Sequence, residues 1–132
     1  NGGCPIHHKV TVDEIERLRR EFPNATVICH PECAPEVQKA SDMIGSTGYM
    51  IRNCGEKQEW IIVTESGILH PLRKRYPETA FHGIEAVCDN MKLITLKDLY
   101  ETLAEGKNEV VVEKETADRA RKAIERMIEA SA

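Results

Sequence analysis

The stretch Trp60-Ile-Ile-Val63-Thr-Glu-Ser-Gly67 (WIIVTESG) contains the clearest β-strand of the sequence. Its four consecutive apolar residues, three of them β-branched, are typical of a short strand that is buried on both faces. Thr64 to Gly67 are expected to form a loop, followed by a helix to about Tyr76. Pro71 lies inside that helix, where we expect it either to kink the helix or to mark its true first turn.

Similar short apolar runs alternate with helical patterns along the rest of the chain. Further strands are expected at residues 25–28, 43–44 and 80–81, an extended segment at 110–112, and helices at 12–22, 35–41, 49–54, 96–104 and 115–130. Strands that alternate with helices imply a parallel sheet covered on both faces. The sequence therefore predicts an α/β fold.

Two of the expected helices carry strong local signals. Thr11 and Glu14 form a capping box, in which the Thr hydroxyl accepts from the amide of Glu14 and the Glu carboxylate reaches back. The last helix is amphipathic. Its apolar positions, which we expect to face inward, are Ala120, Ala123, Ile124, Met127 and Ile128.

The composition is that of a globular protein and excludes several kinds of partner. Of 132 residues, 41% are hydrophobic and 30% are charged, so the chain is long enough to bury a core and is not disordered. The net charge is −4 with acidic and basic residues interleaved, so we expect no nucleic-acid partner. Apolar runs are only a few residues long, so we expect no membrane span.

The beginning of the sequence and its cysteine content bear on two questions: whether the chain is part of a longer polypeptide, and in which compartment it works. Asn1-Gly-Gly-Cys4 has no initiator Met and no helix or strand signal, so we expect a fragment of a longer polypeptide. The five cysteines are an odd number and no secretory signal is recognisable. A cytoplasmic location is expected, with cysteines used for metal binding or catalysis rather than for disulfides.

Polar residues follow the expected strands at the point where each strand ends. In parallel sheets ligands gather at the carboxyl ends of the strands. Those ends carry Cys29-His-Pro-Glu32, Gly45-Ser-Thr-Gly48, Thr64-Glu65 and His82. A ligand site is therefore expected at this edge of the sheet.

The stretch Val27–Glu36 (VICHPECAPE) places two cysteines, a histidine and a carboxylate within five residues. Cys29 and Cys33 have a spacing that zinc tolerates, but the usual second pair of ligands is missing. Burial of Cys29 at the end of a strand accounts for these cysteines better. His30 and Glu32 either converge on one ligand, where one donates a hydrogen bond and the other exchanges a proton, or serve as a loop histidine and a helix cap.

Other candidate groups lie in loops that precede helices. Ser46 and Thr47 present hydroxyls and free amides suited to an anion, although an ordinary helix cap accounts for them better on sequence alone. Cys4 and Cys88 each precede a helix and are able to reach a common metal if the ends of the domain fold together. Two thiolates do not hold an iron–sulfur cluster, so a third would come from outside this chain. Cys54 has no expected role.

Taken together, five motifs resemble those of the quinolinate synthase family in order and spacing, over essentially the whole chain. They are Gly3-Cys4-Pro-Ile-His7, His30-Pro-Glu-Cys33-Ala-Pro-Glu36, Gly45-Ser-Thr-Gly48, Thr64-Glu65-Ser-Gly-Ile-Leu-His70 and Cys88-Asp-Asn-Met-Lys92. The resemblance implies three similar αβα domains about a pseudo-threefold axis, with one [4Fe–4S] cluster at the centre. Residues 1–88 would be the third three-layer αβα domain, with a short parallel sheet, and residues 89–132 a helical segment that packs on the absent first domain.

The resemblance also implies an activity. The family condenses iminoaspartate with dihydroxyacetone phosphate to quinolinate, releasing phosphate and water, in NAD biosynthesis. Partners would be these two substrates, the remainder of the same polypeptide, and L-aspartate oxidase or aspartate dehydrogenase as the source of iminoaspartate. The alternative, from a different class, is a non-catalytic αβα module whose loops only bind an anion.

Site roles follow from the same resemblance. Cys4 and Cys88 would be cluster ligands, and the iron without a cysteine would act as a Lewis acid. Glu32 would move protons, while His30 and His7 would donate to a substrate carboxylate or hydroxyl. Ser46 and Thr47 would hold the second carboxylate or the phosphate. One cluster ligand and much of the pocket lie outside the chain, so the chain alone is expected to be inactive.

Overall fold

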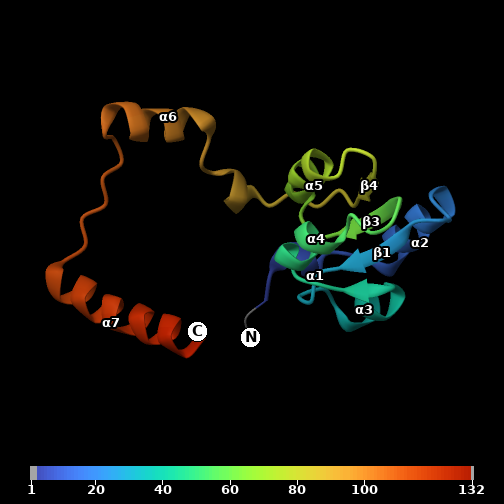
Figure 1. The fold of residues 1–132 in the computed structure, drawn as a ribbon, viewed down its shortest axis with the longest axis horizontal. Helices are drawn as coiled ribbons and strands as arrows, with labels where there is room; N and C mark the ends of the chain where they lie inside the picture. Colours follow the sequence, from blue (N-terminus) through green and yellow to red (C-terminus); the bar gives the residue numbers. More distant parts are fainter. Residues whose placement is uncertain (1–2, 132) are drawn as a thin grey trace. The chain divides into compact units, whose positions relative to one another are not determined.

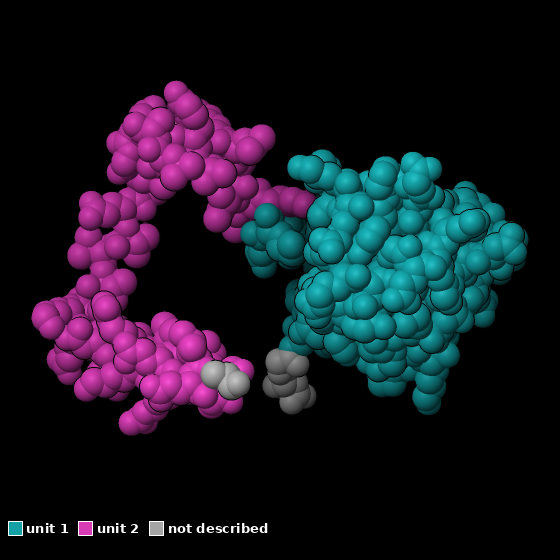
Figure 2. Space-filling model, in the orientation of Figure 1, with its two compact units in different colours: residues 1–91 teal, residues 92–132 magenta. Residues whose placement is uncertain are grey.

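The computed structural model describes residues 3–131. These residues form two compact units, one up to residue 91 and one from residue 92, which are coloured separately in Figure 2. The division falls inside the short 3-10 helix η2 (Asp89–Lys92). All the candidate site residues named above lie in the first unit.

Within the described residues, the first unit is built on one sheet of four parallel strands (Figure 1). The strands are β1 (Thr26–Cys29), β2 (Met43–Ile44), β3 (Glu59–Val63) and β4 (Ala80–Gly83), in the order β2-β1-β3-β4. All three neighbouring pairs are parallel, and Cys29 is the register partner of Val63. The prediction of an α/β fold with a parallel sheet is confirmed.

Helices cover both faces of this sheet. The residues of β1 and β3 alternate between two core clusters, because successive side chains of a strand point to opposite faces. Val27 and Ile61 pack in one cluster with α2 (Val12–Glu21) and α3 (Pro35–Ala40). Ile28 and Ile62 pack in the other with α4 (Thr47–Asn53) and α5 (Leu69–Arg75). This double cover is the reason why the apolar run of β3 is continuous rather than alternating.

Two local predictions about helices can be checked directly. The capping box at Thr11 and Glu14 is present: the Glu14 amide donates to Thr11 Oγ1 and the Thr11 amide donates to Glu14 Oε2. Pro71 is the third residue of α5, which follows the 3-10 helix η1 (Ser66–Ile68). Pro71 therefore marks the first turn, where the missing amide hydrogen is not needed.

The second unit contains α6 (Leu96–Glu105) and α7 (Lys114–Ser131). The prediction that the apolar side of α7 faces inward is wrong for the described chain. Ile124, Met127 and Ile128 are 53%, 62% and 60% exposed, and Ala120 and Ala123 are exposed as well. The helix is amphipathic as predicted, but no described residue buries its apolar side. None of the helices in residues 3–131 is long and apolar enough to cross a membrane.

Candidate active site

The candidate site begins at the carboxyl ends of β1 and β3, which lie side by side in the centre of the sheet. Cys29 and Val63 are paired, and the His30 amide donates to the Val63 carbonyl at 3.1 Å. The chain leaves the sheet at the same level in both strands, so His30 and Thr64 begin neighbouring loops. This is the edge at which the sequence predicted a site.

His7 enters this edge from α1 (Pro5–His8), a single helical turn that begins after Cys4. Pro5 suits the first helical position, because its missing amide hydrogen would have no partner there. The His7 side chain is buried, with only 7% of the residue exposed. Its Nε2 atom shares a 2.8 Å hydrogen bond with Oγ1 of Thr64, the residue that follows β3.

His30 and Glu32 converge with His7. The rings of His7 and His30 stack with centroids 4.3 Å apart and an interplanar angle of 11°. Glu32 Oε2 lies 3.4 Å from His7 Nδ1 and 3.6 Å from His30 Nδ1. The spacing of His30 and Glu32 left two roles open, and the structure favours their convergence over separate loop and capping roles.

The hydrogen bonds constrain the protonation of the two imidazoles. The Glu32 amide donates to His30 Nδ1 at 3.2 Å, so that nitrogen is an acceptor and the ring proton lies on Nε2. Burial lowers the pKa of His7 below its ordinary value, and the nearby His30 adds to this effect, while Glu32 opposes it. His7 is therefore favoured in its neutral form, with one nitrogen free to accept.

Cys4 lies beside the same group. One ligand atom each of Cys4, His7 and Glu32 lie within 4.8 Å of one another. Cys4 is partly exposed, His7 is buried and the Glu32 side chain is 49% exposed. A thiol, an imidazole and a carboxylate thus meet at the edge of the sheet.

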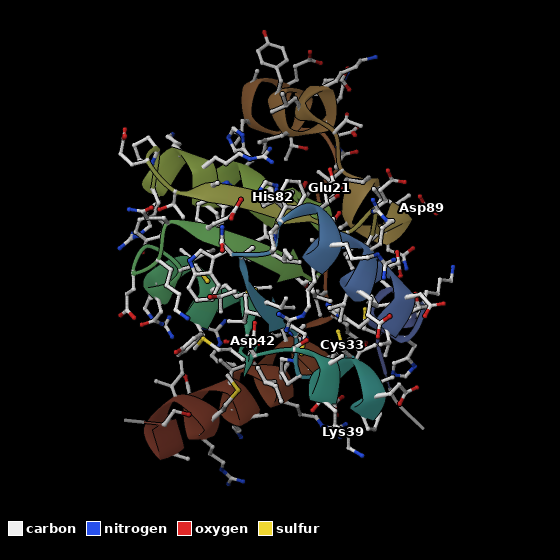
Figure 3. The ribbon with its side chains drawn as sticks, turned by 90° about the vertical axis from the view of Figure 1, so that its right-hand side faces the viewer. Glu21, Cys33, Lys39, Asp42, His82 and Asp89 are labelled. Carbon is white, nitrogen blue, oxygen red and sulfur yellow. The ribbon has the colours of Figure 1, made fainter. Side chains whose placement is uncertain are left out.

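The five cysteines fall into two classes. Cys29, Cys33 and Cys54 are buried in the cores of the sheet, whereas Cys4 and Cys88 are partly exposed. A hydrogen bond to Cys29 and burial raise the pKa of the Cys33 thiol, and burial raises the pKa of Cys54 to about 11. Burial of the Cys29–Cys33 pair is confirmed; Cys33 is labelled in Figure 3.

Ser46 and Thr47 lie at the carboxyl end of β2, and both are exposed. Ser46 is the cap of α4, and its Oγ accepts from the Tyr49 amide at 3.2 Å. No hydrogen bond or ion pair of residues 3–131 joins Ser46 or Thr47 to the histidines or to Glu32. The structure shows the helix-capping role of Ser46 directly, and both residues are exposed just after β2.

His82 does not belong to this group, contrary to expectation. Strand β4 continues through His82, whose register partner is Ile61 in the middle of β3. Its Nε2 lies 3.0 Å from Glu59 Oε1, and its ring stacks on that of Phe22 with the centroids 3.4 Å apart. His82 is labelled in Figure 3. The predicted strand, 80–81, is too short, which is why His82 was wrongly assigned to the strand end.

Two further residues, Thr64 and Glu65, hold parts of the site in place through hydrogen bonds. Thr64 holds His7, as described, and Glu65 is buried beside it. Glu65 Oε2 accepts from the Gly67 amide at 2.7 Å, and Oε1 accepts from the Cys88 amide at 3.5 Å. The sequence signal for this support is the position of two polar residues directly after a fully buried strand, because such residues need partners.

Comparison with known proteins points to the same family as the five sequence motifs. The family model described as "Quinolinate synthetase A protein" matches residues 1–129. The chain belongs to this family. Among quinolinate synthases, that of Pyrococcus horikoshii is 48% identical over 132 residues, and that of Pyrococcus abyssi is 46% identical over 133. The quinolinate synthase of Methanocaldococcus jannaschii is 38% identical over 135 residues.

These three alignments cover 98%, 99% and 96% of this chain respectively, but in each case only 44% of the relative. The chain thus spans less than half the length of the quinolinate synthases it matches.

Proposed function

We propose that this chain is the C-terminal part of an enzyme that condenses iminoaspartate with dihydroxyacetone phosphate to quinolinate in NAD biosynthesis. The observation that carries the proposal is the convergence of His7, His30 and Glu32 beside Cys4, in a chain that matches the family over residues 1–129. Proton transfer and anion binding are the tasks these side chains suit.

Cys4 and Cys88 would hold a [4Fe–4S] cluster together with a third cysteine from the remainder of the polypeptide. The donor set fits this role, because these two thiols are partly exposed while the other three are buried in the core. The Cys88 amide donates to Glu65 Oε1, which ties the Cys88 loop to the end of β3. A cluster with one iron free of cysteine supplies a Lewis acid for dehydration when bound.

Glu32 is the proposed proton carrier. Its carboxylate oxygen lies 3.4 Å from His7 Nδ1 and 3.6 Å from His30 Nδ1, and the side chain is half exposed, so it contacts both imidazoles and remains accessible to a substrate. Isomerisation and dehydration steps of the condensation move protons next to a carbonyl or imine. A carboxylate in this position accepts such a proton and returns it to a leaving hydroxyl.

His30 and His7 are proposed to bind the substrates. With its Nδ1 accepting from the Glu32 amide, His30 presents an Nε2 proton to a substrate carboxylate or hydroxyl. His7 presents its Nδ1 edge, since Nε2 is held by Thr64. Ser46 and Thr47, exposed at the end of β2, are proposed to hold the second carboxylate or the phosphate.

The same proposal assigns roles to the two parts of the chain. Residues 1–88 would be the third αβα domain, and residues 89–132 would pack on the first domain. The exposed apolar side of α7 supports this, since a large apolar surface is typical of a contact with further protein. No cysteine of residues 3–131 forms a disulfide, which fits the proposed cytoplasmic location. In that compartment an oxidase or a dehydrogenase would supply the iminoaspartate.

The test is quinolinate formation by the full-length protein that contains this chain, reconstituted anaerobically with iron and sulfide. Iminoaspartate is generated in the assay and dihydroxyacetone phosphate is added. We expect turnover by the full-length protein and none by the isolated 132-residue chain, because one cluster ligand and most of the pocket are missing from it. A full-length protein that binds anions but neither iron nor sulfide would instead support the non-catalytic module.

A further inference from the structure

Gln38 connects helix α3 to the loop that carries Glu32. Its side-chain nitrogen Nε2 lies 2.9 Å from the Pro31 carbonyl oxygen and 2.7 Å from the Cys33 carbonyl oxygen. Both partners are acceptors only, so the NH2 end of the amide faces them and donates one of its two hydrogens to each carbonyl. Gln38 therefore holds the residues immediately before and after Glu32.

The loop between these two carbonyls is a tight turn of four residues. The Cys33 amide donates to the His30 carbonyl at 3.0 Å, and Pro31 is the second residue of the turn, a position that its fixed φ angle suits. Glu32 is the third residue. The turn's own hydrogen bond uses only the His30 carbonyl, so the carbonyls of Pro31 and Cys33 take their partner from outside the turn. Gln38 is that partner.

The peptide group between Pro31 and Glu32 is held at both ends. Its carbonyl accepts from Gln38, and its amide donates to His30 Nδ1 at 3.2 Å. A rotation of this peptide plane would break both hydrogen bonds at once. The orientation of one peptide plane therefore determines both the direction in which the Glu32 side chain leaves the backbone and the tautomer of His30.

The helix that carries Gln38 is itself fixed, as it must be if Gln38 is to hold the turn. Val37, the preceding residue of α3, is completely buried in the core. The Ala40 carbonyl, at the end of the helix, accepts from Arg19 at 3.0 Å. Helix α3 is thus attached to the first unit through contacts that do not involve the turn.

We propose that Gln38 is a positioning residue, which holds the turn on both sides of Glu32 and so keeps the Glu32 carboxylate within reach of His7 and His30. The Glu32 side chain is 49% exposed, so dense packing does not fix its place. With the turn held, its Oε2 lies 3.4 Å from His7 Nδ1 and 3.6 Å from His30 Nδ1. The inference rests on the proposed function, in which Glu32 carries protons, although the hydrogen bonds of Gln38 need no substrate.

The first test compares Gln38→Met with the unaltered full-length protein, both reconstituted anaerobically to equal iron content. Methionine keeps the length of the side chain and suits a helix, but it donates no hydrogen bond. Because a misplacement of about 1 Å costs on the order of 10²-fold in rate, we expect kcat to fall by about 10–100-fold with little change in KM. Should the methionine variant not fold, Gln38→Glu keeps the size of the side chain and replaces the donor by an acceptor.

A double-mutant cycle separates the positioning of Glu32 from a general effect on the fold. In a Glu32→Gln background, Gln38→Met should lower kcat little further, because the group that Gln38 positions no longer carries a proton. Lys39→Met alters an exposed neighbour on the same helix, labelled in Figure 3, and should leave kcat unchanged. A normal kcat in Gln38→Met, or a loss of equal size with and without the Glu32 carboxylate, would overturn the proposal.

A second measurement involves no turnover and distinguishes failure of this inference from failure of the proposed function. Isotope-labelled histidine is incorporated into the full-length protein, and the NMR shifts of the His30 ring nitrogens, assigned with His30→Gln, report its tautomer. With neutral rings, the unaltered protein and Lys39→Met should carry the His30 proton on Nε2, whereas Gln38→Met should give a mixture of tautomers. An unchanged tautomer in Gln38→Met would refute the role of Gln38 whether or not quinolinate is made. A changed tautomer in a protein that makes no quinolinate would contradict only the proposed function.

Discussion

Thr64 and His7 are separated by 57 residues in the chain, and their side chains share a buried hydrogen bond of 2.8 Å. Thr64 is the first residue after β3, and His7 lies in the one-turn helix α1. The bond therefore attaches the beginning of the domain to the end of its central strand. It also fixes which edge of the His7 ring faces Glu32.

Removing the Thr64 hydroxyl should destabilise the domain. Thr64→Val keeps the shape of the side chain but leaves His7 Nε2 buried without a partner. Since an unsatisfied buried polar group costs about 1–3 kcal/mol, we expect a loss of that size in the free energy of unfolding, measured with urea. Thr64→Ser retains the hydroxyl and serves as the control. Equal stability of the valine and serine variants would show that the bond contributes little.

Asp42 should make the stability of the domain depend on acidic pH. Burial acts to raise the pKa of this carboxyl, but hydrogen bonds from Arg19 and from the Val27 amide outweigh it and hold the pKa below the ordinary 3.8. The folded state therefore binds the proton less readily than the unfolded state does. The stabilisation is complete above the unfolded pKa and is lost as the pH falls through the folded one.

The measurement for Asp42, which is labelled in Figure 3, is the free energy of unfolding as a function of pH. We expect stability to decline as the pH drops below 3.8, and Asp42→Asn to flatten that part of the curve. Because the Asp42 side chain is 43% exposed, the effect should shrink at high salt. An unchanged slope in the asparagine variant would show that other carboxyl groups are responsible.

Whether a cysteine substitution lowers the iron content should depend on whether that cysteine is partly exposed or buried. In the full-length protein, Cys4→Ala or Cys88→Ala leaves two of three proposed ligands, which do not retain a cluster, so iron and sulfide content should fall to background. Cys29→Ala and Cys54→Ala alter buried core thiols and should leave iron content unchanged. Iron that is lost with Cys29→Ala but kept with Cys4→Ala would contradict the assignment.

The apolar side of α7 should be buried in the full-length protein. Ile128 is 60% exposed in the described chain. If α7 packs on the first domain, Ile128→Asp removes a contact worth about 1.5–3 kcal/mol and adds a charge to the interface, so the thermal midpoint of the full-length protein should fall. Glu129→Lys, which changes a charge on the same helix, is the control. Equal midpoints for both variants would argue against that packing.

The sequence predicted the sheet because the necessary information is local. Four apolar residues at Trp60–Val63 require burial on both faces, and a parallel sheet between helices provides it. The site was predicted less completely. The spacing of His30 and Glu32 left their convergence as one of two readings, and the position of His7 depends on a contact with Thr64 that no local pattern reports. In α7 the pattern showed an apolar side but not what covers it, because no residue of the described chain does so.

Glu32 provides the most discriminating prediction about the proposed activity. A carboxylate that carries protons must titrate, whereas one that only binds substrate must accept hydrogen bonds. Glu32→Gln preserves the size of the side chain and removes the titrating group. General acid–base catalysis contributes typically about 10²–10⁴-fold, so we expect kcat to fall by roughly that factor with little change in KM.

His30→Ala should behave differently from Glu32→Gln, because it removes a donor to a charged substrate, worth about 1.5–3 kcal/mol, and so should raise KM as well. Glu36→Gln, in the first turn of α3, is the control for the loss of a carboxylate near the site. All variants are compared anaerobically at equal iron content, with kcat and KM measured separately. A Glu32→Gln enzyme with normal kcat and a much higher KM would make Glu32 a binding residue. The proton chemistry would then move to His7, whose Nδ1 faces the same space and whose neutral form is favoured by burial.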